Sequence, residues 1–290
     1  MICNLALTRY DPTIPGGTGS LGYHVSEAFL NDGSYKVKIL RRKPENTDEK
    51  TNLLASKGAE IVYVDYNQKD DLLNALKGTD VIVSVLNGID TYDLQSKLLT
   101  AAKEVNVKRF IPSEFGGEYK YGDHMYINSK VKFQEDLKKS GLEYTIIYTG
   151  LFQEYLGWVG FDVKKKEATF YVDENKIIPS TSLSDIGKYT AESLKIPEAR
   201  NGTIRVAGVI LSLKEYLQKF EEATGSKWKV TEDKNVRYRF QNKIDPVPSE
   251  LDDFKVVALE HLSFEKIDND KFSFTPRPVT EIINALVSQA

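Results

Sequence analysis

Strand-like and helix-like segments alternate through the first half of this 290-residue chain. Short apolar runs at residues 37–40, 60–64, 80–86, 108–111 and 144–148 have the length and composition of buried strands. The stretches between them, such as residues 71–76, 93–105 and 129–140, have helical periodicity. A series of this kind predicts parallel strands joined by helical crossovers, so we expect an α/β fold with helices on both faces of one sheet.

A glycine-rich turn precedes this series. Gly16, Gly19 and Gly22 have the spacing G-x-x-G-x-x-G. In a Rossmann-type site the first glycine permits the tight bend, the second lets the backbone approach a pyrophosphate, and the third lets the helix pack closely. The pyrophosphate lies at the helix N-terminus, where free N–H groups and the helix dipole favour an anion. We therefore expect a doubly wound dinucleotide-binding domain whose turn contacts come from Gly16, Thr18, Gly19, Ser20, Leu21 and Gly22.

Two prolines, Pro12 and Pro15, stand where the first central strand is expected, and proline cannot donate to a ladder. Two arrangements are open. Residues 2–8 could form the strand, with residues 9–15 inserted, or the strand could be short and occupy residues 13–15. We favour the second, because the glycine turn normally follows its strand at once. In either case we expect the prolines to interrupt any continuous strand from residue 2 to residue 16.

The second strand ends in Leu40, Arg41, Arg42 and Lys43. An NAD site usually has an acidic residue near this point for the ribose 2′-hydroxyl, whereas an NADP site has arginine for the 2′-phosphate. The sequence therefore predicts NADP(H) as the cofactor. A solvated charge run at a strand end is the alternative interpretation.

The pattern becomes irregular after residue 150. Helices are still predicted at residues 184–194, with Ser184 as the N-cap, and at residues 212–224, ended by Gly225. We expect residues 1–150 to form the NADP-binding Rossmann domain. Residues 151–290 are expected to form a smaller, irregular α/β domain on the substrate side, with segments that return to the first sheet.

Composition excludes several classes of function. A net charge of −3 with interspersed acids and bases leaves no basic patch for nucleic acid. The single Cys3 and the scattered His24, His124 and His261 predict neither disulfides nor a metal site. Apolar runs are strand-sized, and residues 1–15 lack the features of a secretion signal. We expect a cytoplasmic monomer or homodimer that acts on a small molecule, without a membrane or nucleic-acid partner.

Several motifs together resemble one family. They are VKRFIPSEFG at residues 107–116, Lys130, GLEYTIIYTGLF at 141–152, GGTGSLG at 16–22 and DVIVSVLNG at 80–88. They resemble the isoflavone reductase-like branch of the NmrA-like proteins, atypical short-chain dehydrogenases whose plant members reduce phenylpropenoids. The resemblance covers residues 13 to about 225 and is strongest over residues 80–152. It implies an NADPH-dependent reductase of a small, aromatic or conjugated organic substrate.

The resemblance also implies roles for individual residues. Arg41 and Lys50 are implied at the 2′-phosphate, and Phe152 is implied against the nicotinamide. Lys130, at the start of the helix after the SEFG loop, is implied as the general base or proton relay beside the nicotinamide ribose. The turn formed by Leu86, Asn87 and Gly88 is implied to lie beside the part of the cofactor that joins adenosine to nicotinamide. The segment between residues 116 and 130 is shorter than in the plant enzymes, so their substrates are not carried over.

The residues themselves suggest a second catalytic arrangement. Tyr126 lies four positions before Lys130, and Ser113 lies 13 positions before Tyr126, as in the Ser-Tyr-Lys triad of ordinary short-chain dehydrogenases. Lysine beside a phenol favours the phenolate, so Tyr126 could exchange a proton with a carbonyl oxygen that Ser113 holds. Two other functions stay open: a flavin-free quinone reductase, and a non-catalytic NADP(H) sensor that acts through a protein partner. We expect such a sensor to lack a lysine at position 130.

Overall fold

The computed structural model describes residues 10–44, 48–88 and 90–290, and the chain divides into two compact units that are interleaved in sequence. The first unit is made of Met1–Glu114, Ser129–Ile147 and Ile186–Ile204. The second is made of Phe115–Asn128, Tyr148–Asp185 and Arg205–Ala290. Each unit therefore draws on several separate stretches of the chain.

The first unit is built on a sheet of seven strands, counted over the described residues, in the order β11-β6-β5-β4-β1-β2-β3. Its strands are β1 (Pro12–Pro15), β2 (Lys38–Arg41), β3 (Glu60–Tyr63), β4 (Val81–Val83), β5 (Arg109–Ile111), β6 (Glu143–Tyr148) and β11 (Gly202–Arg205). Strands β1 to β6 pair in parallel. The strand order reverses between β1 and β4, and α/β sheets bind ligands at the carboxyl ends of strands at such a point. The predicted doubly wound fold is confirmed.

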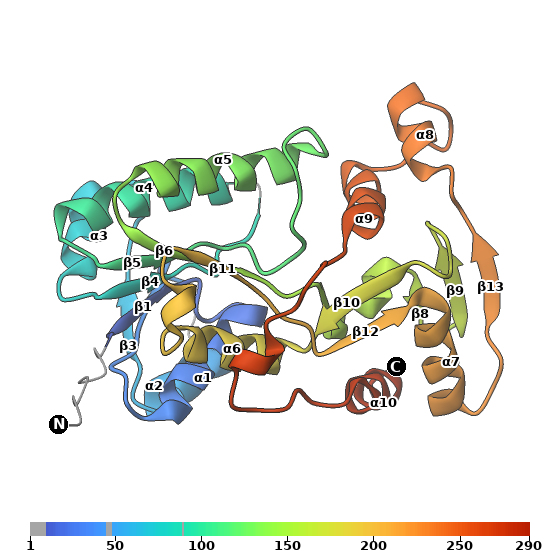
Figure 1. The fold of residues 1–290 in the computed structure, drawn as a ribbon, viewed down its shortest axis with the longest axis horizontal. Helices are drawn as coiled ribbons and strands as arrows, with labels where there is room; N and C mark the ends of the chain where they lie inside the picture. The colour runs from blue at the N-terminus through green and yellow to red at the C-terminus, as the bar shows by residue number, and fades with distance from the viewer. Residues whose placement is uncertain (1–9, 45–47, 89) are drawn as a thin grey trace. The chain divides into compact units, whose positions relative to one another are not determined.

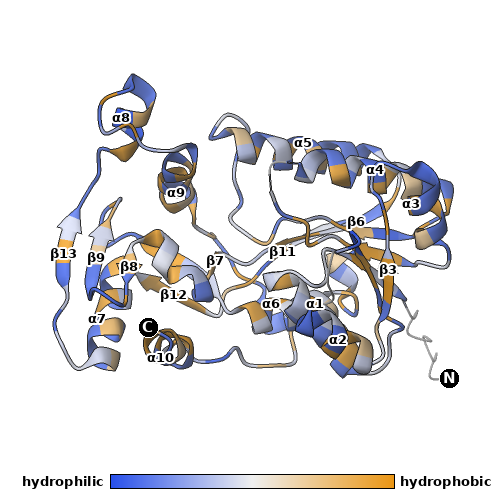
Figure 2. Cartoon of the chain, turned by 180° about the vertical axis from the view of Figure 1, so that it is seen from behind, coloured by the Kyte–Doolittle hydropathy of each residue, from blue (hydrophilic) through white to orange (hydrophobic). Residues whose placement is uncertain are grey.

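Helices cover both faces of this sheet (Figure 1). One face carries α1 (Ser20–Asp32), α2 (Glu49–Ser56) and α6 (Leu183–Ser193), and the other carries α3 (Lys69–Leu76), α4 (Thr91–Glu104) and α5 (Met125–Lys139). Leu40, Ile82, Leu98, Phe110 and Phe133 are fully buried in one cluster of this core. Figure 2 shows the same division, with hydrophobic residues on strands such as β3 and hydrophilic residues on α3 and α4. Most of the apolar runs thus become the buried centre of the sheet, whereas β3 lies at its edge and is partly exposed.

Strand β1 contains both prolines. It has four residues, all buried, and it pairs with β2 on one side and β4 on the other. The short strand predicted at residues 13–15 is confirmed and gains Pro12. Among the described residues the strand begins only at Pro12, so the expectation that no continuous strand runs from residue 2 to residue 16 is not contradicted. Both prolines nevertheless lie within the ladder, because their carbonyls and those beside them still accept hydrogen bonds: Pro15 O accepts from Val85 N at 3.0 Å, and Asp11 O from Val81 N. The alternative strand at residues 2–8, like Cys3, lies outside the described residues.

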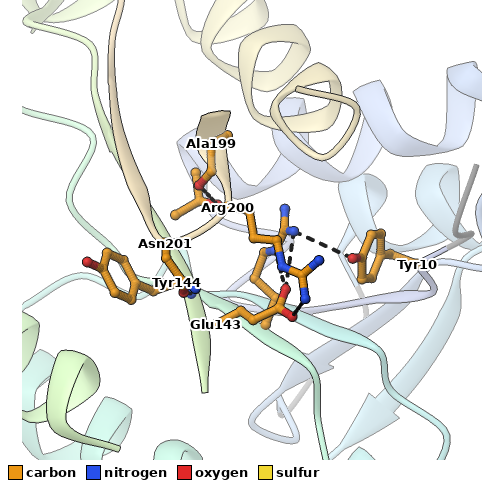
Figure 3. Close-up of polar contacts among 8 residues, drawn as sticks. Tyr10, Glu143, Tyr144, Ala199, Arg200 and Asn201 are labelled. Carbon is orange, nitrogen blue, oxygen red and sulfur yellow. Dashed lines mark hydrogen bonds and ion pairs between the residues drawn. The ribbon is translucent and has the colours of Figure 1, made fainter. Parts of the chain in front are cut away.

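An ionic network fixes the amino-terminal edge of the sheet (Figure 3). Arg109 and Glu143 are the first residues of β5 and β6 and are paired in register. The Arg109 side chain is only 3% exposed, and its Nη2 lies 3.3 Å from Glu143 Oε2. Its guanidinium also lies 5.0 Å from the centroid of the Tyr10 ring, and Arg200 pairs with the other oxygen of Glu143. This network stands at the edge opposite the carboxyl ends of the strands.

The second unit contains two small sheets, ordered β12-β10-β7 and β13-β9-β8. Its strands are β7 (Leu151–Phe152), β8 (Phe161–Asp162), β9 (Glu167–Phe170), β10 (Ile177–Thr181), β12 (Val209–Ser212) and β13 (Lys229–Glu232). Its helices include α7 (Leu213–Thr224), α8 (Val236–Asn242), α9 (Glu250–His261) and α10 (Val279–Ser288), with a 3₁₀ turn η1 (Gln153–Val159). Phe161, Phe170, Tyr216 and Phe220 form an aromatic centre for its core.

Two helix predictions for the second half of the chain can be compared with the structure. Helix α7 follows the predicted residues, with Ser212 in a capping box with Glu215 and Gly225 as its left-handed C-cap. Helix α6 begins one residue earlier than expected, and Ser182 accepts a hydrogen bond from Asp185 N at 3.2 Å. Ser184 therefore lies inside the helix and is not the N-cap. Both serines suit a cap, but only Ser182 has an acidic residue three positions later.

Candidate functional site

The glycine turn joins β1 to α1, and Gly16 and Gly22 in it have no room for a side chain. Gly16 has a φ of 80°, and a Cβ added to it would lie 2.9 Å from Val85 O. A Cβ on Gly22 would lie 2.1 Å from Gly16 O, so the first turn of α1 packs directly on the backbone of the bend. The structure thus brings the predicted turn residues together. Gly17, which the sequence interpretation left without a role, is buried and its carbonyl accepts from Ser26 Oγ at 3.0 Å.

The N-terminus of α1 is suited to an anion. Its N-cap, Gly19, is exposed and offers no side-chain hydrogen bond to the first turn, and no acidic residue lies in that turn. The first N–H groups of the helix therefore keep their positive partial charge for a ligand. Thr18 and Leu21 are half-buried and Ser20 is exposed. A bend in which Gly16 and Gly22 have no room for a Cβ, and which leads into a helix without a side-chain cap, fits the pyrophosphate of a dinucleotide.

Arg41 is held in place at the end of β2. Its Nη1 donates to Asp48 Oδ2 at 2.6 Å and also to the Thr51 hydroxyl. Asp48 is the N-cap of α2, and its Oδ1 accepts from Thr51 N at 2.9 Å. Partial burial disfavours the ionised carboxyl, but the hydrogen bonds from Arg41 and Thr51 prevail and lower the pKa of Asp48 to about 2. Asp48 is therefore a carboxylate at neutral pH, and the predicted phosphate-binding arginine has a negative partner.

The other predicted cations stand apart from this pair. Arg42 and Lys50 are exposed, and Lys50 Nζ lies 5.9 Å from the centroid of the Tyr23 ring on α1.

Tyr66, which follows β3, is a buried phenol close to this region. Its burial raises the pKa of the hydroxyl, although the positive charge of Arg42 lowers that pKa in part. The Tyr66 hydroxyl is buried and has no hydrogen-bond partner among the described residues. A group of this kind is one that a bound ligand could satisfy.

Hydrogen bonds join the loops that follow β4 and β5. Ser113 Oγ donates to Leu86 O at 2.6 Å, and Ser113 N donates to Oε1 of the buried Gln95 on α4 at 2.8 Å. Asn87 and Gly88 come next and are exposed. The structure therefore brings Ser113 to the predicted Leu86 turn. Its hydroxyl hydrogen is engaged by Leu86, so holding a substrate oxygen as a donor would require that bond to break. Nothing in the sequence indicated Gln95.

Lys130 and Glu114 meet at the carboxyl end of β5. Lys130 Nζ donates to the backbone carbonyl of Glu114 at 2.7 Å. The Glu114 side chain is 5% exposed, and its Oε1 has no hydrogen-bond partner within the described ranges. Burial raises the pKa of this carboxyl, while the charge of Lys130 and a hydrogen bond with Gln134 offset part of the rise. Glu114 belongs to the SEFG motif, but the sequence interpretation gave it no role.

Helix α5 begins earlier than predicted. It starts at Met125, and the Asn128 amide donates to the His124 carbonyl at 2.8 Å. Lys130 therefore lies in the second turn of the helix and not at its start. Tyr126 lies on the same helix, four positions before Lys130, in the stretch that belongs to the second unit.

The two predicted aromatic site residues lie in the second unit. The Tyr126 amide donates to Nδ1 of the buried His124 at 3.2 Å, and the Tyr126 ring lies 5.6 Å from that of Phe254, centroid to centroid. Phe152, in β7, lies 6.0 Å from the Tyr155 ring. Both side chains are half-buried. Their roles at the nicotinamide and in proton transfer remain predictions.

Comparison with known proteins assigns the family. A sequence model of the NmrA-like family matches residues 13–273. The chain belongs to the NmrA-like family. Pinoresinol reductase 2 of Arabidopsis thaliana is 32% identical over 233 residues, which cover 73% of each chain. A solved structure described as AtPrR2 with NADP+ and (+)pinoresinol has a TM-score of 0.80 at 25% identity, covering 96% of this chain and 99% of that one. Photosystem II assembly factor Ycf39 of Cyanophora paradoxa is 29% identical over 227 residues, 74% of this chain and 69% of that protein.

The resemblance to this family is thus confirmed, and the match to the family model extends to residue 273, beyond the end of the resemblance near residue 225. None of the helices in the described part of the chain is long and apolar enough to cross a membrane. The cytoplasmic location and the monomeric or homodimeric state stay predictions.

Proposed function

We propose that this NmrA-like protein is an NADPH-dependent reductase of a small aromatic or conjugated substrate, with Lys130 as the group that handles the proton. The observation that carries the proposal is the place of Lys130, whose ammonium is held at the carboxyl end of β5 by Glu114 O at 2.7 Å. The carboxyl ends of the strands are where sheets of this kind bind their ligands. The named relatives, a pinoresinol reductase among them, support a substrate of the phenylpropanoid class.

The cofactor, when bound, supplies the hydride. The glycine bend and the uncapped N-terminus of α1 would take its pyrophosphate, and Arg41 would take its 2′-phosphate. Arg42 and Lys50 lie exposed near this end and would add positive charge. The Leu86 to Gly88 turn would border the dinucleotide between its two rings, and Phe152 would pack against the nicotinamide. The local geometry supports the roles proposed for the glycine bend, the N-terminus of α1 and Arg41. The other roles rest on the resemblance to the family.

Lys130 has the donors that proton transfer needs. An ammonium carries three N–H groups, and only the one on Glu114 O has a hydrogen-bond partner within the described part of the chain. The remaining two can donate to the nicotinamide ribose and to a substrate oxygen. In reduction, a proton would pass from Nζ to the substrate and be replaced from solvent. Ser113 and Tyr126 would serve as secondary groups in this scheme.

Substitution of Lys130 separates catalysis from cofactor binding. Lys130→Ala should abolish NADPH oxidation with a panel of enones, quinones and phenylpropanoid ethers, while NADPH affinity stays within about tenfold, since one hydrogen bond contributes only about 0.5–1.5 kcal/mol. Lys139→Ala, an exposed lysine on the same helix, is the matched control and should leave both unchanged. Tyr126→Phe should reduce turnover less than Lys130→Ala. Full activity of Lys130→Ala would refute the assignment.

A non-catalytic NADP(H)-sensing role is the second candidate. The observation in its favour is that one relative, Ycf39, is named an assembly factor and not a reductase. A sensor of this kind would bind NADP(H) and act through a protein partner. Tight NADP(H) binding together with no oxidation of NADPH by any acceptor in the panel would favour this role over the reductase.

A further inference from the structure

A carboxylate and a guanidinium lie side by side at the proposed ribose end of the dinucleotide site. Arg41 is the last residue of β2, where an NAD site has its ribose-selecting carboxylate. Asp48 comes from the N-cap of α2, and its Oδ2 lies 2.6 Å from Arg41 Nη1. A carboxylate therefore stands beside the arginine, although it comes from the start of α2 and not from the end of the strand. The sequence alone shows only the arginine there.

We propose that Asp48 is a specificity-determining residue that narrows the preference of this protein for NADPH over NADH. Its carboxylate would accept a hydrogen bond from the 2′-hydroxyl of NADH, and its charge would oppose the 2′-phosphate of NADPH beside Arg41. This inference rests on the proposed use of NADPH and concerns the choice between the two dinucleotides.

The geometry allows Asp48 both to accept a hydrogen bond from NADH and to repel the phosphate of NADPH. One oxygen, Oδ1, caps α2 through Thr51 N, and the other, Oδ2, faces the guanidinium and also accepts from the Thr51 hydroxyl at 2.9 Å. The Asp48 side chain is 44% exposed, so a ligand can reach it, whereas the Arg41 side chain is only 14% exposed. Arg41 Nε and Nη2 donate to no residue within the described ranges. Arg41 can therefore bind a phosphate through these groups while Asp48 keeps its hold on Nη1.

The expected changes in NADPH and NADH affinity depend on how far water screens the Asp48 carboxylate. Water screens the repulsion between the Asp48 carboxylate and a phosphate of charge near −2, so its removal should tighten NADPH about 3- to 10-fold. Loss of a hydrogen bond from the ribose hydroxyl to a carboxylate should weaken NADH by about 3- to 10-fold. The ratio of the two affinities should then widen by about 10- to 100-fold.

Titration of NADPH and NADH into the full-length protein, followed by nicotinamide fluorescence, tests the proposal without any substrate. Asp48→Asn and Asp48→Ser both keep a side chain that can cap α2 and both remove the charge. Asp32→Asn is the matched control, because Asp32 is also an ion-paired carboxylate, 2.5 Å from Lys195 Nζ, but stands at the far end of α1 from the glycine turn. Urea unfolding of each variant checks that the fold is retained.

The expected result is a larger ratio of NADPH to NADH affinity in both Asp48 variants and an unchanged ratio in Asp32→Asn. An unchanged ratio in either Asp48 variant, a weaker affinity for NADPH in either, or an equal change in Asp32→Asn would overturn the proposal. If the unmodified protein bound neither dinucleotide, the proposed function would fail as well. If it bound NADPH and only the Asp48 result failed, the proposed function would stand.

Discussion

Replacement of Gly22 by alanine should damage cofactor binding and folding together. The new Cβ would lie 2.1 Å from Gly16 O and 2.9 Å from Gly17 Cα, and these neighbours are backbone atoms that no rotamer change can move. To restore ordinary contact, the first turn of α1 must shift by about 1 Å, and overpacking of this kind costs about 1–3 kcal/mol in the free energy of unfolding.

The same shift moves the N–H groups that would receive the pyrophosphate. Hydrogen bonds lengthened by about 1 Å lie outside the useful range of 2.7–3.2 Å. Each bond to a charged group contributes about 1.5–3 kcal/mol, so the loss of one predicts NADPH affinity lower by about 10- to 150-fold. Gly22→Ala should therefore lose affinity even at temperatures where the variant is fully folded.

Gly33→Ala is the matched control at the other end of α1. Gly33 is the C-cap with a φ of 72°, and a Cβ there would meet no atom within 4 Å. Its left-handed backbone should cost about 1–2 kcal/mol in stability, similar to Gly22→Ala, without altering the binding end of the helix. Urea unfolding and NADPH titration of both variants provide the measurement. The reasoning is refuted if Gly22→Ala binds NADPH as tightly as the unmodified protein, or if Gly33→Ala loses affinity equally.

Two further predictions concern charged residues. Arg41→Glu should weaken NADPH by about 1.5–3 kcal/mol, because it removes a charge-assisted contact with the 2′-phosphate; equal affinities of the unmodified protein for NADPH and NADH would contradict the premise. Burial raises the pKa of Glu114, so the folded state holds this proton more tightly than the unfolded state, and this contribution to stability is lost as pH rises from about 4.5 through the raised pKa. Glu114→Gln should therefore gain stability relative to the unmodified protein as the pH rises above about 4.5, measured by urea unfolding, and a difference that does not vary with pH would argue against it.

Sequence reasoning identified the parts of this fold that depend on local pattern. The apolar runs became the strands of the first sheet because strand length and buried composition are properties of a short segment. The tight bend at Gly16 and Gly22 could be predicted, because their spacing is typical of that backbone geometry. The position of Asp48 beside Arg41 could not be predicted, because the ion pair forms only when α2 folds back beside β2. The contact between Lys130 and a backbone carbonyl is equally invisible in sequence, since any residue type carries that carbonyl.

The start of α5 and the first strand show why boundaries were harder. No strong capping residue marks Met125 as a helix start, so the predicted helix began four residues late. Pro12 and Pro15 argue against a central strand, yet β1 is so short that neighbouring carbonyls supply enough acceptors for the ladder. Tertiary pairing thus outweighed a local preference that is reliable in longer strands.

The interleaving of the two units sets a limit on how the protein can be shortened. A fragment that ended near residue 150 would lack β11, which is the neighbour of β6 on one side and comes from Gly202–Arg205. The sequence of β6, EYTIIY, is rich in β-branched and aromatic residues, and its last four residues are buried in the intact chain. Such a strand with unpaired N–H and C=O groups is a template for another chain. A nucleotide-binding fragment cut at this point should therefore self-associate, whereas the intact chain protects that edge with its own later segment.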